Sequence, residues 1–170
     1  MPVGAKNPSA ADAEAERLVE TYADLMLRLS YTYLKSTHDA EDICQTVLLK
    51  LVYGGYVFDS PEHERAWIVR TTANSCKDVL RGAHRKRTVT LDETFDRPAP
   101  VPPESAVLDE VMALPQKYRE AIYLHYYEGF TIREIAEITG RSEAAVSAHL
   151  SRGRGKLRTT LKGAYSEQGI

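Results

Sequence analysis

Apolar side chains recur every three to four residues along most of this chain, and this period constrains its fold more than any other feature. The first stripe lies in residues 16–35: Leu18, Tyr22, Leu25, Leu29 and Tyr33. Such spacing puts the apolar side chains on one face of an amphipathic helix. No segment of four to eight residues alternates between apolar and polar as a half-buried strand would, so the pattern predicts an all-α protein.

The same period predicts six further helices, punctuated by caps and glycines. The expected ranges are 16–35, 39–53, 60–86, 105–113, 115–128, 131–138 and 142–162. Gly54 and Gly55 end the second helix, and Ser60 followed by Pro61 starts the third. The expected core stripes are Ile43, Val47 and Leu51 in the second helix, then Ala66, Val69, Ala73, Cys76 and Leu80 in the third.

The helical period disappears between Arg87 and Glu104, where Pro98, Pro100, Pro102 and Pro103 stand among acidic residues. Proline-rich sequence of this kind is typical of a linker. We therefore expect two small helical domains joined by a Pro-rich connector. The expected segments are a flexible N-terminus at 1–15, a first domain at 16–87, a linker at 88–104, a second domain at 105–163 and a tail at 164–170.

Charge is unevenly distributed along the 170 residues, although the net charge is only −2. Residues 1–45 carry four basic and eight acidic side chains, and 88–112 carry one basic and six acidic. Residues 77–87 carry five basic side chains and one acidic, and 141–162 carry six basic and one acidic. Two basic patches on an acidic chain point to a polyanion partner, because such binding depends on local Lys/Arg density.

Several classes of protein do not fit this sequence. The two cysteines, Cys44 and Cys76, lie 32 residues apart on expected core positions, which excludes a disulfide scaffold and a zinc ribbon and favours buried structural thiols. No apolar stretch reaches the ~18 residues of a membrane span, and no signal peptide starts the chain. No nucleophile and base pair, metal-ligand spacing or phosphate-binding loop stands out. We expect a cytoplasmic protein without cofactor or metal that is not an enzyme.

The C-terminal residues contain a helix-turn-helix pattern. Thr131 and Glu134 form a capping box, Gly140 suits a left-handed helix C-cap, and Ser142 caps the next helix. In that helix Val146, Leu150, Leu157 and Leu161 should pack inward, while Ser147, Ser151, Arg154 and Arg158 point outward. This outer face fits a DNA major groove, with Glu143, Ser147, His149 and Arg152 as candidate base readers. The alternative is a structural helix pair with a solvated basic face.

A second polar face lies on the third helix, at spacings of three and four residues: Trp67, Arg70, Asn74, Lys77 and Arg81. An aromatic ring, an amide and three cations can hold an unstacked base and its phosphates, which are the ingredients of single-strand recognition. Taken alone, Trp67 is better explained as a core residue. The basic run from Arg85 to Arg87 favours the nucleic-acid interpretation of the whole face.

The second helix carries Asp42, Gln45 and Leu49 on the side opposite its core stripe, which suits a protein contact. Together, three stretches resemble the small extracytoplasmic-function (ECF) group of bacterial sigma factors. Residues 39–45 resemble region 2.2 of that family. Trp67 to Arg70, with Asn74, Asp78 and Arg81, resemble regions 2.3 and 2.4, and residues 114–154 resemble region 4.

The resemblance implies a dissociable subunit that binds core RNA polymerase, through the β′ clamp helices and the β subunit, and promoter DNA. An anti-sigma factor is a further partner that it allows, and no membrane is involved. Polymerase binding would use Asp39, Glu41, Asp42, Gln45 and Leu49. Recognition and melting of the −10 element would use Trp67, Arg70, Asn74, Lys77, Asp78, Arg81 and Arg85. Recognition of the −35 element would use Arg141, Ser142, Glu143, Ser147, His149, Ser151, Arg152, Arg154 and Arg158.

This chain departs from the family at some positions. Thr46 stands where an acidic residue is usual, and Leu48 and Val52 stand where aromatics are common. Two other functions remain open from the residues alone. One is a helix-turn-helix repressor or activator whose N-terminal helices dimerise or sense a ligand, and the other is an anti-sigma-like adaptor that works only through protein contacts.

Overall fold

A computed structural model describes residues 9–87 and 106–167, and these residues form helices without any strand. The expected linker at 88–104 lies outside the described residues. The helices are α1 (Ala10–Leu34), α2 (Thr37–Tyr53), α3 (Pro61–Arg87), α4 (Ala106–Ala113), α5 (Gln116–Ile122), the π-helical η2 (Tyr123–Tyr127), α6 (Ile132–Thr139) and α7 (Glu143–Glu167). The all-α expectation is confirmed. None of these helices is long and apolar enough to span a bilayer.

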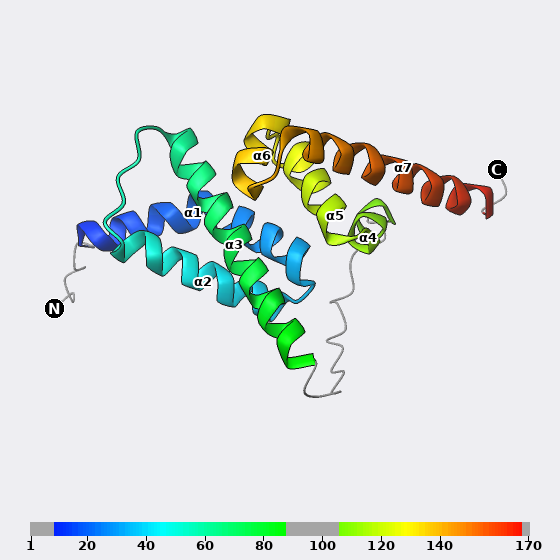
Figure 1. The fold of residues 1–170 in the computed structure, drawn as a ribbon. Helices are drawn as coiled ribbons and strands as arrows, with labels where there is room; N and C mark the ends of the chain where they lie inside the picture. Colours follow the sequence, from blue (N-terminus) through cyan, green and yellow to red (C-terminus); the bar gives the residue numbers. More distant parts are fainter. Residues whose placement is uncertain (1–8, 88–105, 168–170) are drawn as a thin grey trace.

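The N-terminal domain consists of α1 and α2 packed side by side, with α3 crossing both (Figure 1). Its core is made by the apolar stripes of the three helices. Val47 of α2 and Val69, Ala73 and Cys76 of α3 are fully buried, as the sequence predicts. Met26 was missed: it is fully buried, whereas its neighbour Leu25, which the spacing placed in the stripe, is only half-buried.

Helix α1 starts at Ala10, earlier than the expected residue 16. A capping box explains the difference: the Asp12 amide donates to Ser9 Oγ over 3.2 Å, and the Ser9 amide donates to Asp12 Oδ2 over 3.0 Å. The expectation that residues 1–15 form a flexible terminus is therefore wrong from residue 10 onward. Further along α1, Arg17 lies beside α3, where its guanidinium bonds Glu64 over 2.9 Å.

The C-terminal domain packs α4, α5 and α6 against the N-terminal part of α7, whose other end extends away from the bundle (Figure 1). The range expected as one helix at 115–128 is in fact α5 followed by η2, where the Glu128 amide bonds Tyr123 O over 3.2 Å in the five-residue π pattern. Leu124, the second residue of η2, is fully buried.

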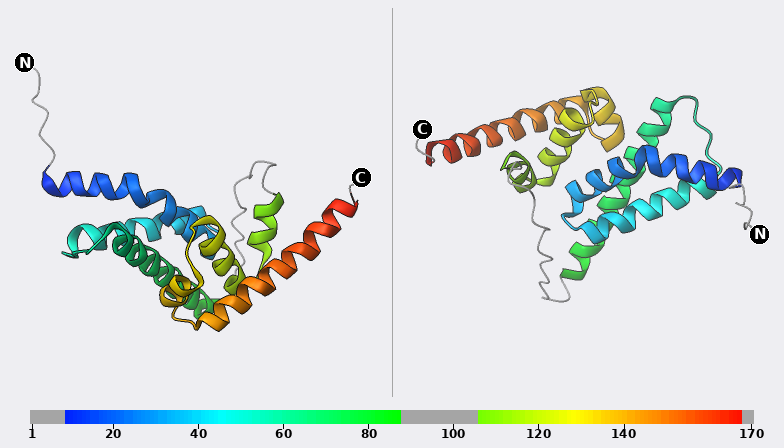
Figure 2. Two further views of the ribbon diagram at one scale, coloured as in Figure 1. Left: turned by 90° about the horizontal axis from the view of Figure 1, so that it is seen from above. Right: turned by 180° about the vertical axis from the view of Figure 1, so that it is seen from behind.

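The two domains pack on each other, with α6 against α3 and α5 against α1. In the views from above and behind, the C-terminal domain lies across one side of the N-terminal helices (Figure 2).

Candidate nucleic-acid interface

The helix-turn-helix forms as the sequence predicts. Glu134 accepts the Thr131 amide over 2.7 Å, and Thr131 Oγ1 accepts the Glu134 amide over 3.2 Å, so α6 starts with a complete capping box. Gly140 ends α6 with φ of 69°, in the left-handed region that favours glycine. Ser142 Oγ then accepts the Ala145 amide over 3.1 Å at the start of α7. These local bonds set the angle between the two helices.

Helix α7 has one buried and one exposed face. Val146 and Leu150 are buried, and Leu157 is half-buried against the core. The outer face carries polar and basic residues, all of them exposed: Ser142, Glu143, Ser147, Ser151, Arg152, Arg154 and Arg158. A helix of this kind can enter a major groove and meet phosphates with its arginines and base edges with its shorter side chains.

The packing of α7 on α5 is unusually close at Gly153. A Cβ atom there would lie 3.1 Å from Ile122 Cγ1 and 3.4 Å from Tyr118 Cβ. The glycine is buried and lets the two helix backbones approach, which the sequence did not reveal. On the outer face, the Tyr126 hydroxyl accepts a hydrogen bond from Arg154 over 2.8 Å. The first contact sets how closely α7 lies on α5, and the second joins the outer face of α7 to η2.

His149 differs from the other candidate base readers because it is half-buried. Its ring stands edge-on to Tyr118 at 5.7 Å between centroids, and its Nδ1 lies 3.3 Å from Arg141 Nη1. Desolvation, followed by the nearby Arg141 charge, lowers the pKa of the imidazole. The ring is thus partly withdrawn from the outer face, which favours a structural role over base reading.

The polar face of α3 is only partly exposed. Arg70, Asn74, Asp78 and Arg81 are exposed, and Asp78 and Arg81 pair with each other. The side chain of Arg85 lies outside the described part of the structure. The polar face of α3 therefore presents the free amide of Asn74, flanked by charged side chains.

Trp67 is half-buried in an aromatic cluster with residues of the preceding loop. Its ring centroid lies 4.5 Å from that of Tyr56 and 5.8 Å from that of Phe58. The cluster borders the α3 face, and Tyr56 is itself 49% exposed. The ring thus packs within the domain and remains partly accessible, and its role in stacking bases stays a prediction. The loop aromatics were missed because no period marks a loop residue.

Two cations of the α3 face bond to the C-terminal domain. Arg70 donates to the Glu137 carbonyl over 2.6 Å, and Lys77 Nζ lies 3.1 Å from Glu120 Oε1. Glu120 was not singled out from the sequence, yet it is only 2% exposed. Its partners are distant in the sequence, and no local pattern identifies a contact of that kind.

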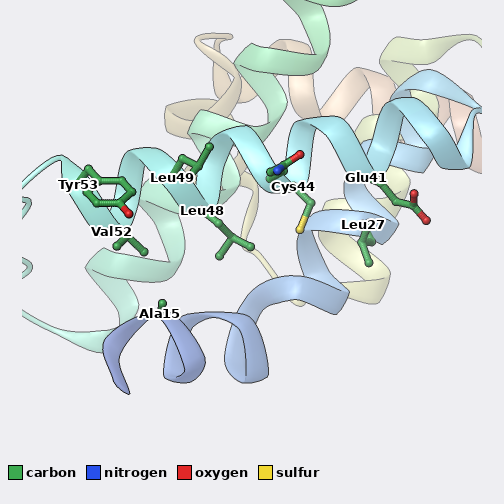
Figure 3. Close-up of a pocket in the computed structure, with 9 residues that line it drawn as sticks. Ala15, Leu27, Glu41, Cys44, Leu48, Leu49, Val52 and Tyr53 are labelled. Carbon is green, nitrogen blue, oxygen red and sulfur yellow. The ribbon is translucent and has the colours of Figure 1, made fainter. Parts of the chain in front are cut away.

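The residues expected to bind polymerase all lie on the exposed side of α2: Asp39, Glu41, Asp42, Gln45 and Leu49. Beside them, α1 and α2 form a groove of about 410 Å³ (Figure 3). Its lining is mostly apolar: Ala15, Leu27, Cys44, Leu48, Leu49, Val52 and Tyr53, together with Glu41 and Gln45. Leu49 is 51% exposed and Tyr53 81% exposed, so this surface offers apolar contact area rimmed by polar groups.

The fold and the two faces define a two-domain helical protein with a DNA-binding helix-turn-helix. Family comparison identifies its class further. The model of Sigma-70 region 2 matches residues 18–86, and that of Sigma-70 region 4 matches residues 105–157. These matches together span most of the chain.

Individual relatives agree. The ECF RNA polymerase sigma factor SigE of Mycolicibacterium smegmatis is 32% identical over 96% of this chain and 67% of its own length. The RNA polymerase sigma factor SigV of Bacillus subtilis is 30% identical over 79% of this chain and 82% of its own. The sigma factor RpoE of Bartonella quintana, solved in complex with the anti-sigma factor NepR, shares the fold with a TM-score of 0.69 at 21% identity, covering 88% of this chain and 97% of that one.

The chain therefore belongs to the sigma-70 family, in its ECF group. It is an RNA polymerase sigma factor, a protein that binds core polymerase and promoter DNA in transcription initiation. These matches support the family suggested by the sequence and do not support the alternative of a repressor or activator with a sensing domain.

Proposed function

We propose that this sigma factor divides promoter recognition among three surfaces of the chain. The outer face of α7 contacts the −35 element, the polar face of α3 captures the melted −10 element, and the exposed side of α2 binds polymerase. The protein acts in the cytoplasm, through binding and not through catalysis. The observation that carries the proposal is that α7 buries Val146 and Leu150 and exposes all four of its expected outward residues, Ser147, Ser151, Arg154 and Arg158.

On α7, the arginines would anchor the helix to phosphates while the serines and Glu143 meet base edges. Arg154 is held by Tyr126, so its guanidinium is positioned before DNA arrives. Phosphate contacts of this kind orient a protein without reading sequence, and base contacts supply the specificity. We exclude His149 from the readers because its ring packs on Tyr118.

On α3, exposed Asn74 is the central residue of the face, because its amide can both donate to and accept from a base edge. The Trp67 cluster beside it provides rings for stacking. Each captured base contributes roughly 1–3 kcal/mol, and only melted DNA offers such bases, so binding shifts the equilibrium toward the open state.

On α2, the groove and its polar border form the polymerase surface. Leu49 supplies exposed apolar area, and Asp42 and Gln45 supply polar partners. The structure of the relative RpoE contains an anti-sigma factor. We infer that an anti-sigma factor regulates this chain as well.

Transcription from a promoter template with purified core polymerase tests the proposal. Asn74→Ala should reduce open-complex formation, measured by permanganate reactivity of unpaired thymines, by about tenfold, while its affinity for core stays unchanged. Ser75→Ala is the matched control, because the Ser75 hydroxyl is bonded within α3 to the Thr71 carbonyl over 2.8 Å. Loss of core binding by Asn74→Ala equal to its loss of melting would contradict the assigned face.

The polymerase surface has its own test. Leu49→Glu should weaken core binding, measured by fluorescence anisotropy of labelled sigma factor, because it places a charge in an apolar contact. Val79→Glu makes the same chemical change at an exposed position of α3. If both variants bind core equally well, the α2 surface is not the contact.

A further inference from the structure

The interface between the two domains is built around one buried carboxylate. Glu120 of α5 is 2% exposed, and three side chains surround it, one from α1, one from α3 and one from the turn between α6 and α7. The Tyr33 hydroxyl of α1 donates to Oε1, Lys77 of α3 lies 3.1 Å from Oε1, and Arg141 lies 3.4 Å from Oε2. A buried charge needs such partners because water no longer solvates it.

Further bonds join the domains on either side of this centre. Arg119, next to Glu120, donates to the Tyr33 carbonyl over 3.5 Å. Near the start of α3, Arg65 donates to Glu128 Oε2 over 3.0 Å and stacks on the Phe130 ring at 4.4 Å. The two domains are therefore held by a line of polar contacts along α3, and this arrangement is a specific closed state.

The closed state engages the cations that the proposed −10 face requires. Lys77 is tied to Glu120, and Arg70 is tied to the Glu137 carbonyl. The outer face of α7 stays exposed in the same arrangement. Single-stranded DNA must take Lys77 and Arg70 away from the C-terminal domain, whereas among the described residues a duplex at α7 competes with Glu120 only for Arg141.

We propose that Glu120 is an internal competitor of nucleic acid, a carboxylate of the C-terminal domain that holds Lys77 in the closed state and so keeps this cation of the −10 face from DNA until the domains separate. The proposal rests on the function proposed for α3. On opening, Glu120 and Lys77 gain hydration, which offsets the loss of their ion pair, while Arg141 belongs to the same domain as Glu120 and stays beside it. The closed and open states can then interconvert on binding polymerase.

Glu120→Gln tests this idea in the full-length free protein. The change keeps the shape of the side chain and removes its charge. We expect a larger radius of gyration by small-angle X-ray scattering, and tighter binding of a fluorescent single-stranded dT20 oligonucleotide. A wild-type protein that is nine-tenths closed would bind about tenfold more weakly than the open form, so a gain of up to about tenfold is expected.

Glu137→Gln is the matched control. It removes the same charge from the same domain, but among the described residues the Glu137 carboxylate pairs with Arg133, within α6, and Glu137 contacts Arg70 through its backbone carbonyl. A general electrostatic effect on DNA binding would appear equally in both variants. An unchanged radius of gyration in Glu120→Gln, with dT20 affinity equal to that of Glu137→Gln, would overturn the proposal.

Two further measurements separate this inference from the function on which it rests. If circular dichroism shows that Glu120→Gln is unfolded, Tyr33→Phe takes its place, because it removes one bond to Glu120 with little change in volume. A Tyr33→Phe protein as compact as wild type, and as weak in dT20 binding, would also refute the proposal that Glu120 competes with nucleic acid. With saturating core polymerase, Glu120→Gln should transcribe as wild type does. If Glu120→Gln opens the protein without any gain in dT20 affinity, the closed state does not block DNA binding. If instead α3 does not bind the −10 element, Asn74→Ala in the holoenzyme detects that separately.

Discussion

Two glycines of α7 lie two residues apart in different environments, and exchanging each for leucine should have opposite effects. Gly153 is buried, with Ile122 Cγ1 only 3.1 Å from where a Cβ would stand, while no atom lies within 4 Å of the Cβ position at Gly155. Both changes remove a helix-interior glycine, which favours the folded state by about 0.5–1 kcal/mol. Only Gly153→Leu must also force α5 and α7 apart.

Overpacking of that kind costs about 1–3 kcal/mol. Gly155→Leu should therefore stabilise the C-terminal domain slightly, and Gly153→Leu should be about 1–3 kcal/mol less stable than Gly155→Leu. In a domain of roughly 60 residues this corresponds to about 4–8 °C of melting temperature per kcal/mol.

Thermal unfolding followed by circular dichroism at 222 nm measures the difference, with the wild-type chain as reference. Equal melting temperatures for the two leucine variants would refute the close approach of α5 and α7. A Gly153→Leu protein that melts above wild type would refute it as well, because the gain in helix propensity would then be enough to explain both changes.

Three other predictions concern caps, titration and thiols. Thr131→Ala should lower the free energy of unfolding by about 0.5–2 kcal/mol in urea titrations, because the α6 capping box is lost, and an unchanged midpoint would contradict it. The Arg17 hydrogen bond lowers the pKa of Glu64 in the folded protein. This carboxylate therefore stabilises the fold above its unfolded pKa of about 4.5, and that stability is lost as pH falls through the folded pKa. Glu64→Gln should make the melting temperature fall less steeply over this acidic range when it is measured against pH. Burial raises the pKa of Cys76 to about 11. Maleimide should therefore label Cys76 at pH 8 far more slowly in the native protein than in guanidinium. Equal labelling rates would show that the thiol is accessible in the native protein.

Features set by local chemistry were predictable from the sequence. The capping box at Thr131, the C-cap at Gly140 and the two faces of α7 each depend on residues a few positions apart, and the structure has all of them. The start of α1 was misplaced only because the cap formed by Ser9 was overlooked.

Contacts between distant segments were not predictable. Glu120 looks like a surface residue in its own helix, and its burial depends on Tyr33 and Lys77 from the other domain. The packing of His149 on Tyr118 likewise depends on how α5 meets α7. The residue assignments on α2 and α3 remain predictions, because exposure shows that a side chain is available and not what it binds.

The π-helical turn at Tyr123–Tyr127 also affects how this chain should be compared with its relatives. A π turn holds one residue more than an α turn, so the chain after it is rotated relative to an uninterrupted helix. Where a relative continues α5 as a regular α-helix, the correct alignment needs a one-residue gap within this turn. Without that gap, Tyr126 would be equated with the wrong neighbour, and the tyrosine that holds Arg154 would be assigned to a different position in the related protein.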